Sequence, residues 1–374
     1  MKPVVIAGYA RSPFHFAAKG ELAKVRPDEL AAQVVSALLQ KTGVKAEDIE
    51  DVLVGCAFPE GEQGMNVARI ISFLAKLPLS AAGATVNRFC GSSMQAIHMA
   101  AGAIQMGAGD VFICAGVESM TRIPMGGYNF LPHPGLAKDY PQAFVSMGIT
   151  AENLAKKYDI SRREQQELAV ISHDRASKAR DAGKLSEEII PIGSVTQDGC
   201  IRPGTTQEAL DALKPAFLED GSVTAATSSP LTDGAAATIV ASEDYAKANG
   251  LPILARIRSI AVSGCAPEIM GIGPVGAVKK ALSRAKLSLG DIDIIELNEA
   301  FAAQSLAVVR DLGIDMAKMN IDGGAIALGH PLGATGARIT GKAASLLKRE
   351  GKQFALATQC IGGGQGIATI LEAV

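Results

Sequence analysis

The sequence contains no tryptophan, and aromatic residues make up only 4% of its 374 residues. It has five histidines and six scattered cysteines, without a Cys-x-x-Cys pair, which argues against a zinc site. A net charge of −2 provides no basic surface for nucleic acid or an acidic membrane. No window reaches about 18 uninterrupted apolar residues, so we expect no membrane insertion.

Hydrophobic residues are plentiful, at 48% of the chain, and glycine is abundant with 40 residues. The chain can therefore bury a large core in which small residues allow close backbone approach. The scattered cysteines are typical of reduced thiols in the cytoplasm. The first residues, "MKPVVIAGYARSPF", resemble a strand and a loop rather than a secretory signal.

Two stretches of the chain resemble one another: "GVKAEDIEDVLVGCAF" (43–58) and "KLSLGDIDIIELNEAF" (286–301). Asp48 matches Asp291, an offset of 243 residues, the difference between 291 and 48. The same offset aligns the apolar run that begins at Asp110 with the one that begins at Gln353. In each copy, a predicted helix rich in glycine and alanine lies between the first matched stretch and this apolar run. We predict two copies of a β-α-β-α-β-β unit, with mostly parallel sheets covered by helices.

The first copy is interrupted by a segment of mixed character with proline and glycine turns. Within it, Ser161 and Glu164 predict a capping box at the start of a charged helix. Long insertions at strand ends usually build binding sites, although a lid that only covers the sheet edge is the alternative. The predicted domains are a first half (1–120 plus 233–250), an inserted loop domain (121–232) and a second half (251–374).

Cys90 lies directly before a predicted helix in "VNRFCGSSMQAIHMAAGAIQMG". Free N–H groups and the helix dipole at such a position favour a thiolate, so we expect a lowered pKa and a nucleophile. The alternative is a buried cysteine that only packs.

Three further polar residues stand at predicted strand ends or glycine-rich loops of the second unit. His330 lies within "GGAIALGHPLGATGAR", Cys360 precedes three glycines in "ATQCIGGGQG", and Asn298 ends an apolar run in "ELNEAFA". A turn histidine, an inert cysteine and a helix N-cap are the respective alternatives. If the two units pack together, these loops meet near Cys90 and form a nucleophilic site with a second thiol as acid and base.

Four motifs resemble the four signature regions of the thiolases: "VNRFCGSSMQA", "NEAFAAQ", "GGAIALGHPLGATGAR" and "CIGGGQG". The resemblance covers essentially the whole chain and is strongest to bacterial 3-ketoacyl-CoA thiolases of fatty-acid β-oxidation, also called acetyl-CoA acyltransferases. It implies a five-layered α-β-α-β-α fold of two duplicated β-α-β-α-β-β halves with an inserted loop domain. It implies an acyltransferase that cleaves 3-ketoacyl-CoA with CoA, through a cysteine acyl-enzyme, into acetyl-CoA and a shortened acyl-CoA in a reversible Claisen reaction.

The resemblance also implies roles for the four motifs. Cys90 is the nucleophile, and His330 activates it. Cys360 protonates the departing acetyl-CoA carbanion and then deprotonates the incoming CoA. Asn298 holds a water in one oxyanion hole, and the N–H groups of Cys90 and Gly362 form the second.

Coenzyme A enters as a co-substrate, and the resemblance implies no bound cofactor and no metal. It places Arg202 near the adenine nucleotide and Met147 beside the acyl pocket. The remaining positions that it assigns to substrate binding are Phe217, Ala225, Ser229 and Ala300.

One departure from the family concerns Ser146, which stands where biosynthetic acetoacetyl-CoA members carry a histidine. The segment after "ESM" is also shorter than the tetramerising loop of that group. Both favour longer or varied acyl chains and a homodimer, and degradative members often work with a hydratase–dehydrogenase partner. The alternatives are a biosynthetic acetoacetyl-CoA thiolase, a β-ketoacyl synthase-type condensing enzyme, which has histidine or asparagine in place of Cys360, and a non-catalytic CoA- or lipid-binding relative.

Overall fold

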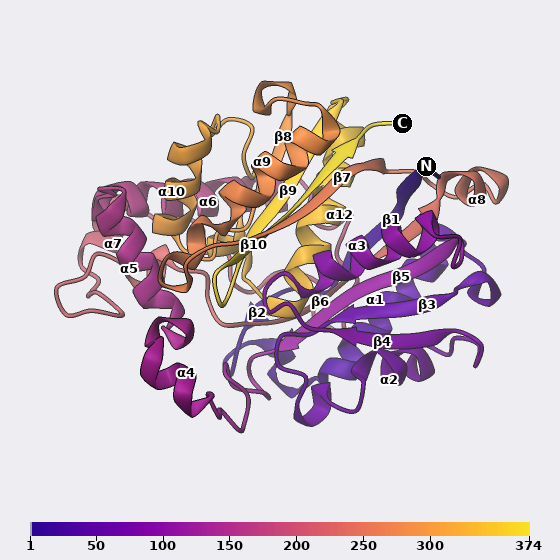
Figure 1. The fold of residues 1–374 in the computed structure, drawn as a ribbon, viewed down its shortest axis with the longest axis horizontal. Helices are drawn as coiled ribbons and strands as arrows, with labels where there is room; N and C mark the ends of the chain where they lie inside the picture. Colours follow the sequence, from indigo (N-terminus) through magenta and orange to yellow (C-terminus); the bar gives the residue numbers. More distant parts are fainter. Residues whose placement is uncertain (1) are drawn as a thin grey trace.

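The computed structural model describes residues 2–374, and its strands form two groups joined edge to edge (Figure 1). In spatial order, the first group consists of β4 (Ala82–Val86), β3 (Asp51–Gly55), β5 (Val111–Ser119), β6 (Thr232–Ser242) and β1 (Val4–Arg11). The second consists of β7 (Ala255–Gly264), β10 (Gln365–Glu372), β9 (Phe354–Ile361) and β8 (Ile294–Leu297). The groups join where β1 pairs with β7, and the short β2 (His15–Phe16) pairs with β6.

The two groups repeat one strand order, which confirms the predicted duplication. β3, β5, β6 and β1 correspond in position to β8, β9, β10 and β7. The place of β4 in the second group is taken by a single parallel bridge between Ile295 and Met319. The offset of 243 residues carries Asp51, which begins β3, onto Ile294, which begins β8.

The predicted predominance of parallel pairing is wrong. β3 pairs in parallel with β4 and β5, as does β8 with β9, but β6 and β10 pair antiparallel with both of their neighbours. β10 follows β9 after the tight turn at 362–364, and a strand joined by so short a connection must run back beside its predecessor. β6 occupies the same place in the first half, although the inserted segment separates it from β5.

Helices cover both outer faces and fill the space between the halves, which gives five layers (Figure 1). Successive strand residues point to opposite faces: Ile113 packs with Val35 of an outer helix, whereas Cys114 packs with Ile97 and Ile339 of the middle helices. The helices of one outer layer are α1 (Pro27–Thr42) and α2 (Val67–Leu74), those of the middle layer are α3 (Ser92–Gln105) and α12 (Leu332–Glu350), and those of the other outer layer are α9 (Gly273–Ala285) and α10 (Ala302–Leu312).

Small residues let the middle helices approach the strand ends. A Cβ atom added at Gly333, at the start of α12, would lie 2.5 Å from the carbonyl oxygen of Val117 and 2.6 Å from that of Gly55. Only glycine fits at such a close backbone approach. The N-termini of α3 and α12 are thereby held at the same edge of the sheets, where the candidate site lies.

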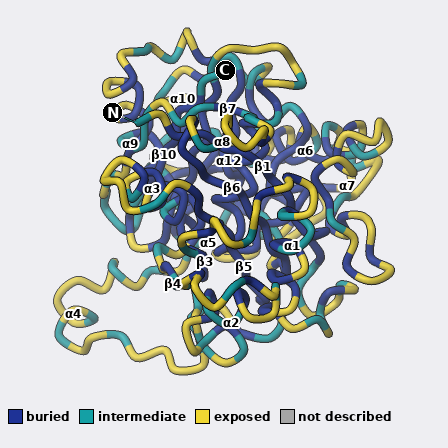
Figure 2. Tube along the Cα trace, turned by 90° about the vertical axis from the view of Figure 1, so that its right-hand side faces the viewer, coloured by how far each residue is buried: buried dark blue, intermediate teal, exposed yellow. Residues whose placement is uncertain are grey.

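The segment between β5 and β6 forms α4 (Pro134–Asp139), α5 (Met147–Lys157), α6 (Arg162–Asp181) and α7 (Gln207–Asp211). The capping box predicted for α6 is present, because Ser161 Oγ accepts from the Glu164 N–H at 3.2 Å and the Ser161 N–H donates to the Glu164 carboxylate at 2.8 Å. The part around α4 projects from the body and is largely exposed (Figure 2).

The remaining short helices are α8 (Glu243–Ala248) and α11 (Ala325–Leu328). Among residues 2–374, no helix combines the length and the apolar character that crossing a lipid bilayer requires.

Candidate active site

Cys90 lies in a tight turn between β4 and α3. The side chain of Asn87 holds this turn, because its Oδ1 accepts from the Phe89 N–H at 2.9 Å and its Nδ2 donates to the Ala57 carbonyl at 3.0 Å. Phe89 adopts a φ of +42°, a conformation that side chains rarely take, and such strain often accompanies functional positions. Gly91 then caps α3, so Cys90 stands directly before the helix, as predicted.

The acidity of Cys90 differs from the prediction. Burial raises the pKa of its thiol to about 11, although N–H groups of Gly362 and of Cys90 itself donate to the sulfur and oppose the rise. The expectation of a lowered pKa is therefore wrong, because desolvation outweighs the helix terminus and the amide donors. The thiol keeps its proton in the resting protein and needs a base before it can attack.

His330 has the tautomer that such a base needs. Thr335 donates its hydroxyl proton to the Pro331 carbonyl at 2.9 Å, so its oxygen accepts from Nδ1–H of His330 at 2.6 Å. Nε2 therefore carries the lone pair and accepts from the Asn298 amide at 3.3 Å. Burial, helped by the charge of Arg338, lowers the pKa of His330 to about 3, so the ring is neutral.

Asn298 directly follows β8, and its backbone N–H donates to the Thr358 carbonyl at 3.0 Å. The alternative of a helix N-cap is excluded, because Phe301 caps the following helix, α10. Asn298 is fully buried, and its Oδ1 has no hydrogen-bond partner within residues 2–374. The amide thus binds His330 through its nitrogen and offers its oxygen to a further polar group.

Cys360 lies near the end of β9 and is fully buried. Burial, followed by the charge of a Cys90 thiolate, raises the pKa of Cys360 well above its ordinary value, so this thiol also keeps its proton. The next residue but one, Gly362, begins the turn to β10 and donates its N–H to the Cys90 sulfur. The turn after β9 in the second half therefore lies next to Cys90, the candidate nucleophile of the first half.

Cys90 and the second-half loops are also linked by packing. Leu332, two residues after His330, lies in one apolar cluster with Cys90 and Ala57. Together with the Asn298–His330 hydrogen bond and the Gly362 amide, this packing places all five residues predicted to be catalytic in one buried region.

Two residues of this region were not predicted from the sequence. Gln359 donates to the carbonyl oxygen of Cys90, and Thr335 fixes the ring of His330. Each lies within five residues of a predicted site residue. Gln359 could have been identified from the sequence, because it is a polar side chain within an apolar strand.

Glu118 is a further residue of this region that the sequence did not predict. One carboxylate oxygen accepts from the N–H groups of Ala57 at 2.8 Å and Gly333 at 2.9 Å, and the other accepts from Gln63 Nε2 at 2.8 Å. It therefore ties the turn after β3 to the start of α12. A single acid within "VFICAGVES" was the available signal, and burial raises the pKa of this carboxyl.

Two of the residues predicted to bind substrate contact motifs of the second half. Met147 begins α5, with its sulfur 3.9 Å from a Cβ built on Gly362. Ser229 donates its N–H and its hydroxyl to the Ala300 carbonyl at 3.0 Å and 3.1 Å. These contacts join the inserted segment to both motifs of the second half.

The other predicted binding residues are more exposed. The ring of Phe217 packs edge-on against Phe301, with centroids 5.8 Å apart. Arg202 is exposed and stacks over Phe16 of β2 at 5.3 Å, and Ala225 is exposed in a short helical turn. Neither Arg202 nor Ala225 contacts the buried region around Cys90 through a hydrogen bond of the described residues.

Comparison with known proteins identifies relatives over the full chain. Family models described as "Thiolase, N-terminal domain" and "Thiolase, C-terminal domain" match residues 4–244 and 251–373. A protein of Bacillus subtilis called 3-ketoacyl-CoA thiolase is 47% identical, with both chains fully covered.

Solved structures agree with these matches. Human mitochondrial 3-ketoacyl-CoA thiolase in complex with CoA is 39% identical, with a TM-score of 0.93 and coverage of 100% of this chain and 98% of the other. The acetyl-CoA acetyltransferase of Bacillus anthracis is 40% identical, with a TM-score of 0.92 and coverage of 100% and 99%.

Proposed function

Since this chain belongs to the thiolase family, we propose that it cleaves 3-ketoacyl-CoA with CoA through an acyl-enzyme on Cys90. The observation that carries the proposal is the contact between the Cys90 turn and the strand that carries Cys360, from different halves: Gln359, next to Cys360, donates its side-chain amide to the Cys90 carbonyl, and the charge of Cys90 raises the pKa of Cys360. A β-ketoacyl synthase-type enzyme is not favoured, because it has no use for Cys360.

In the first half-reaction, His330 Nε2 takes the proton of Cys90, and the thiolate attacks the 3-keto carbon. Burial disfavours either ion alone, but a proton moved from one to the other creates an ion pair whose charges stabilise each other. The developing oxyanion is met by a donor set that includes a water on the Asn298 oxygen, which lacks a partner in residues 2–374. The C2–C3 bond then breaks, and Cys360 donates its proton to the carbanion to release acetyl-CoA.

In the second half-reaction, the Cys360 thiolate removes the proton from the thiol of an incoming CoA. The CoA thiolate attacks the acyl-enzyme carbonyl, and the oxyanion that forms is held by the N–H groups of Cys90 and Gly362, which already point at the sulfur. Collapse releases the shortened acyl-CoA, and protonated His330 returns the proton to Cys90. A high pKa on Cys360 suits this role, because the thiol must give and regain a proton.

The human relative in complex with CoA supports CoA binding by this chain, and we place the CoA site along the inserted segment. Met147 beside Gly362 is placed to line the acyl pocket, Ser229, Ala300, Ala225 and Phe217 to line the pantetheine path, and exposed Arg202 to meet the adenine nucleotide. We assign CoA the role of co-substrate and propose no resident cofactor. The placement of these residues supports an inserted loop domain at 121–232. The first half would then comprise residues 1–120 and 233–250, and the second half residues 251–374.

The finer assignments concern substrate length, assembly and setting. Ser146 at the start of α5 supports 3-ketoacyl substrates longer than acetoacetyl-CoA. A homodimer is supported by β4, which ends the strand order, and by the exposed Met65, Leu79 and Met99 near it. The reaction needs free thiols, which supports a cytoplasmic location. We place the reaction in fatty-acid β-oxidation, with a hydratase–dehydrogenase as the protein partner.

The test is a thiolysis assay over a series of 3-ketoacyl-CoA chain lengths with CoA, following loss of the substrate and formation of acetyl-CoA. We expect turnover with several chain lengths and a higher kcat/KM for longer chains than for acetoacetyl-CoA. Activity confined to acetoacetyl-CoA would instead support a biosynthetic enzyme, and no thiolysis at any length would refute the proposal.

A further inference from the structure

The loop before His330 has little regular structure of its own. Between α10 and α12 the chain forms one short helix, α11, and the backbone takes positive φ angles at Asn320 (+47°), Gly323 (+89°) and Gly329 (+101°). Glycine adopts such angles freely, and asparagine tolerates them better than most residues. The shape of this loop, which carries His330, therefore depends on side-chain contacts.

Glu299 contacts the loop through both of its carboxylate oxygens. It directly follows Asn298 and is only 1% exposed. One oxygen accepts from Asn320 Nδ2 at 2.7 Å, and the other accepts from the Ser172 hydroxyl at 2.7 Å and from the Ile326 N–H at 3.2 Å. The carboxylate therefore binds two positions of the loop and α6 of the inserted segment.

The groups around this carboxylate are themselves fixed. Asn320 Oδ1 accepts from the Leu297 N–H at 3.0 Å, and Asn320 Nδ2 donates to the Leu297 carbonyl at 2.9 Å, at the end of β8. The Ser172 hydroxyl oxygen accepts from the Gly324 N–H at 3.1 Å. A Cβ atom added at Gly324 would lie 2.0 Å from the carboxyl carbon of Glu299, so the loop packs directly on the carboxylate.

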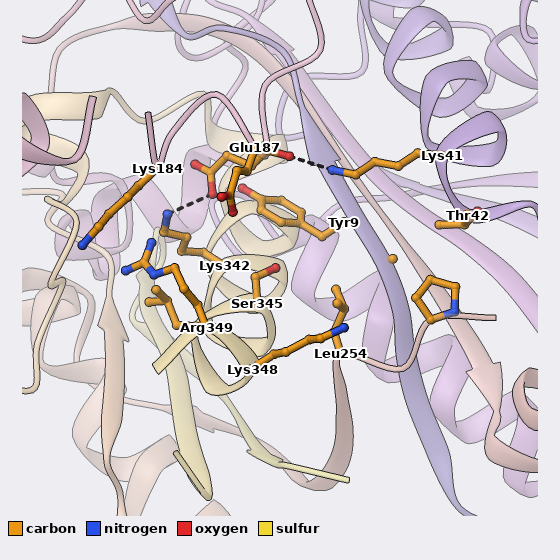
Figure 3. Close-up of a pocket in the computed structure, with 14 residues that line it drawn as sticks. Tyr9, Lys41, Thr42, Lys184, Glu187, Leu254, Lys342, Ser345, Lys348 and Arg349 are labelled. Carbon is orange, nitrogen blue, oxygen red and sulfur yellow. Dashed lines mark hydrogen bonds and ion pairs between the residues drawn. The ribbon is translucent and has the colours of Figure 1, made fainter. Parts of the chain in front are cut away.

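Several other buried carboxylates face a cation. The Glu188 carboxylate lies 3.0 Å from the Lys342 ammonium in the cavity that Figure 3 shows, and the Glu296 carboxylate lies 2.9 Å from the Arg338 guanidinium. The three donors around Glu299 are uncharged instead. A buried carboxylate without a neutralising cation is unfavourable for folding, which indicates a role other than stability.

We propose that Glu299 is a positioning residue that holds Asn298 and His330 at the distance that the reaction needs. The inference rests on the proposed function. The distance of 3.3 Å between Asn298 Nδ2 and His330 Nε2 is at the long end for a hydrogen bond, so a small shift of either residue would break it. Glu299 adjoins Asn298 in the chain and binds Ile326, four residues before His330. It thus fixes both sides of this contact, and the hydrogen bond from Ser172 ties them to the inserted segment.

The test is a rapid-quench measurement of acyl-enzyme formation from a 3-ketoacyl-CoA, with the full chain as wild type and as Glu299→Gln. Glutamine keeps the size of the side chain but replaces one acceptor oxygen with a donor. We expect acylation to slow by about 10–100-fold, with an unchanged KM in steady-state assays and the same final amount of acyl-enzyme. The final amount counts the folded sites, so a slower rate at an equal amount reports misplaced groups rather than unfolded protein.

Ser172→Ala tests the same network from the inserted segment. It removes one donor to Glu299 and the acceptor of the Gly324 N–H, so acylation should slow by about fivefold. Adding Ser172→Ala to Glu299→Gln should slow the reaction little further, because both substitutions act through one network.

Glu243→Gln is a matched control, because Glu243 is also a buried carboxylate. It begins α8 and lies 2.8 Å from Arg256 Nε. The length of β6 separates it from the site: Thr232, the first residue of β6, accepts from the His330 N–H at 3.0 Å, and the strand ends at Ser242. Glu243→Gln should lower the thermal midpoint, since it breaks an ion pair, and should acylate at the normal rate.

An unchanged acylation rate in Glu299→Gln would overturn the inference, whatever the thermal midpoint of that variant. An equally slow Glu243→Gln would also overturn it, because the loss would then follow from reduced stability. If Glu299→Gln does not fold, Ser172→Ala decides, and a normal rate in that variant overturns the inference. A wild-type chain that forms no acyl-enzyme with any 3-ketoacyl-CoA would refute the proposed function, and the inference with it.

Discussion

At the end of β8 the second half carries Asn298, whereas the first half has Gly55 at the matching position at the end of β3. His330 likewise matches Asn87, which fixes the turn before Cys90 through two hydrogen bonds. The two halves thus share a strand order, but in the proposed reaction the first supplies a nucleophile in a rigid turn and the second supplies groups that move protons. The repeated strand order places two sets of loops at one edge, and the residues of the two sets differ.

Glycine in one half also makes room for chemistry in the other. Gly333 matches Cys90, and its close approach to Val117 and Gly55 brings α12 against the first half. The candidate site therefore depends on contact between the halves. We expect substitutions in the two halves to affect turnover and stability differently.

The largest expected effect comes from the first half. Cys90→Ala removes the nucleophile and should lower kcat for thiolysis by at least about 10⁴-fold, since no covalent intermediate can form. Cys114→Ala, which removes another buried thiol of the same half, should keep its turnover. Steady-state assays of both variants check this, and comparable losses in the two would contradict the assignment.

Cys360→Ala tests the second half. Removing the proton donor should lower kcat by about 10³-fold, because general acid catalysis contributes on this order. KM should change little, since the proton transfer that is lost belongs to the chemical step. A variant that retains near-normal kcat would remove Cys360 from the mechanism.

Asn298→Ala should have the next largest effect on turnover. We expect kcat to fall by about 10²-fold, because one oxyanion-stabilising contact is lost. Gly55→Ala at the matching position should act differently, because its Cβ would lie 2.2 Å from the backbone nitrogen of Ser93. That variant should lower the thermal midpoint, whereas Asn298→Ala should leave it almost unchanged. Thermal unfolding and kcat measured together distinguish the two positions, and equal destabilisation would count against the comparison.

Thr335→Val removes the acceptor of the His330 Nδ1–H while keeping the side-chain shape. The tautomer is then less firmly set, and kcat should fall by about tenfold, with an altered pH profile. Thr335→Ser, which restores the hydroxyl, should recover most of the loss. A Thr335→Ser variant as impaired as Thr335→Val would point to packing instead.

The smallest effect on turnover is expected at His98 of the first half, whose Nε2 lies 2.8 Å from the Thr369 hydroxyl. Burial lowers the pKa of His98 from 6.5 to about 3, so the folded protein resists protonation while the unfolded chain accepts it. Stability present above pH 6.5 is therefore lost as the pH falls toward 3, by at most about 1.4 kcal/mol per pH unit from this group. Denaturant unfolding between pH 7 and 4 should show a shallower loss in His98→Gln, and an unchanged slope would contradict this.

Local patterns sufficed to predict much of the molecule. The Ser161 capping box, the apolar strands and the repeated unit depend on neighbours in sequence, and the structure contains them where expected. The antiparallel place of β6 depends on how the chain returns from the inserted segment, which no local pattern encodes. The raised pKa of Cys90 depends on burial by both halves, so the helix-terminus argument alone gave the wrong direction.

The site shows the same division. Cys90, His330, Cys360 and Asn298 were predicted because each is a reactive or polar residue in a glycine-rich or strand-end setting. Glu118 was missed because its partners come from three separate segments of the chain, and only the fold brings their N–H groups together.

The central claim is that groups from the second half activate a thiol of the first, and the most direct test is to locate the acyl group. The full chain is incubated with a 3-ketoacyl-CoA without free CoA, quenched, digested and mapped by mass spectrometry. The claim predicts one acyl group per chain on the peptide that contains Cys90, absent in His330→Gln. An acyl group on Cys360 or any other residue, or undiminished labelling of Cys90 in His330→Gln, would contradict it.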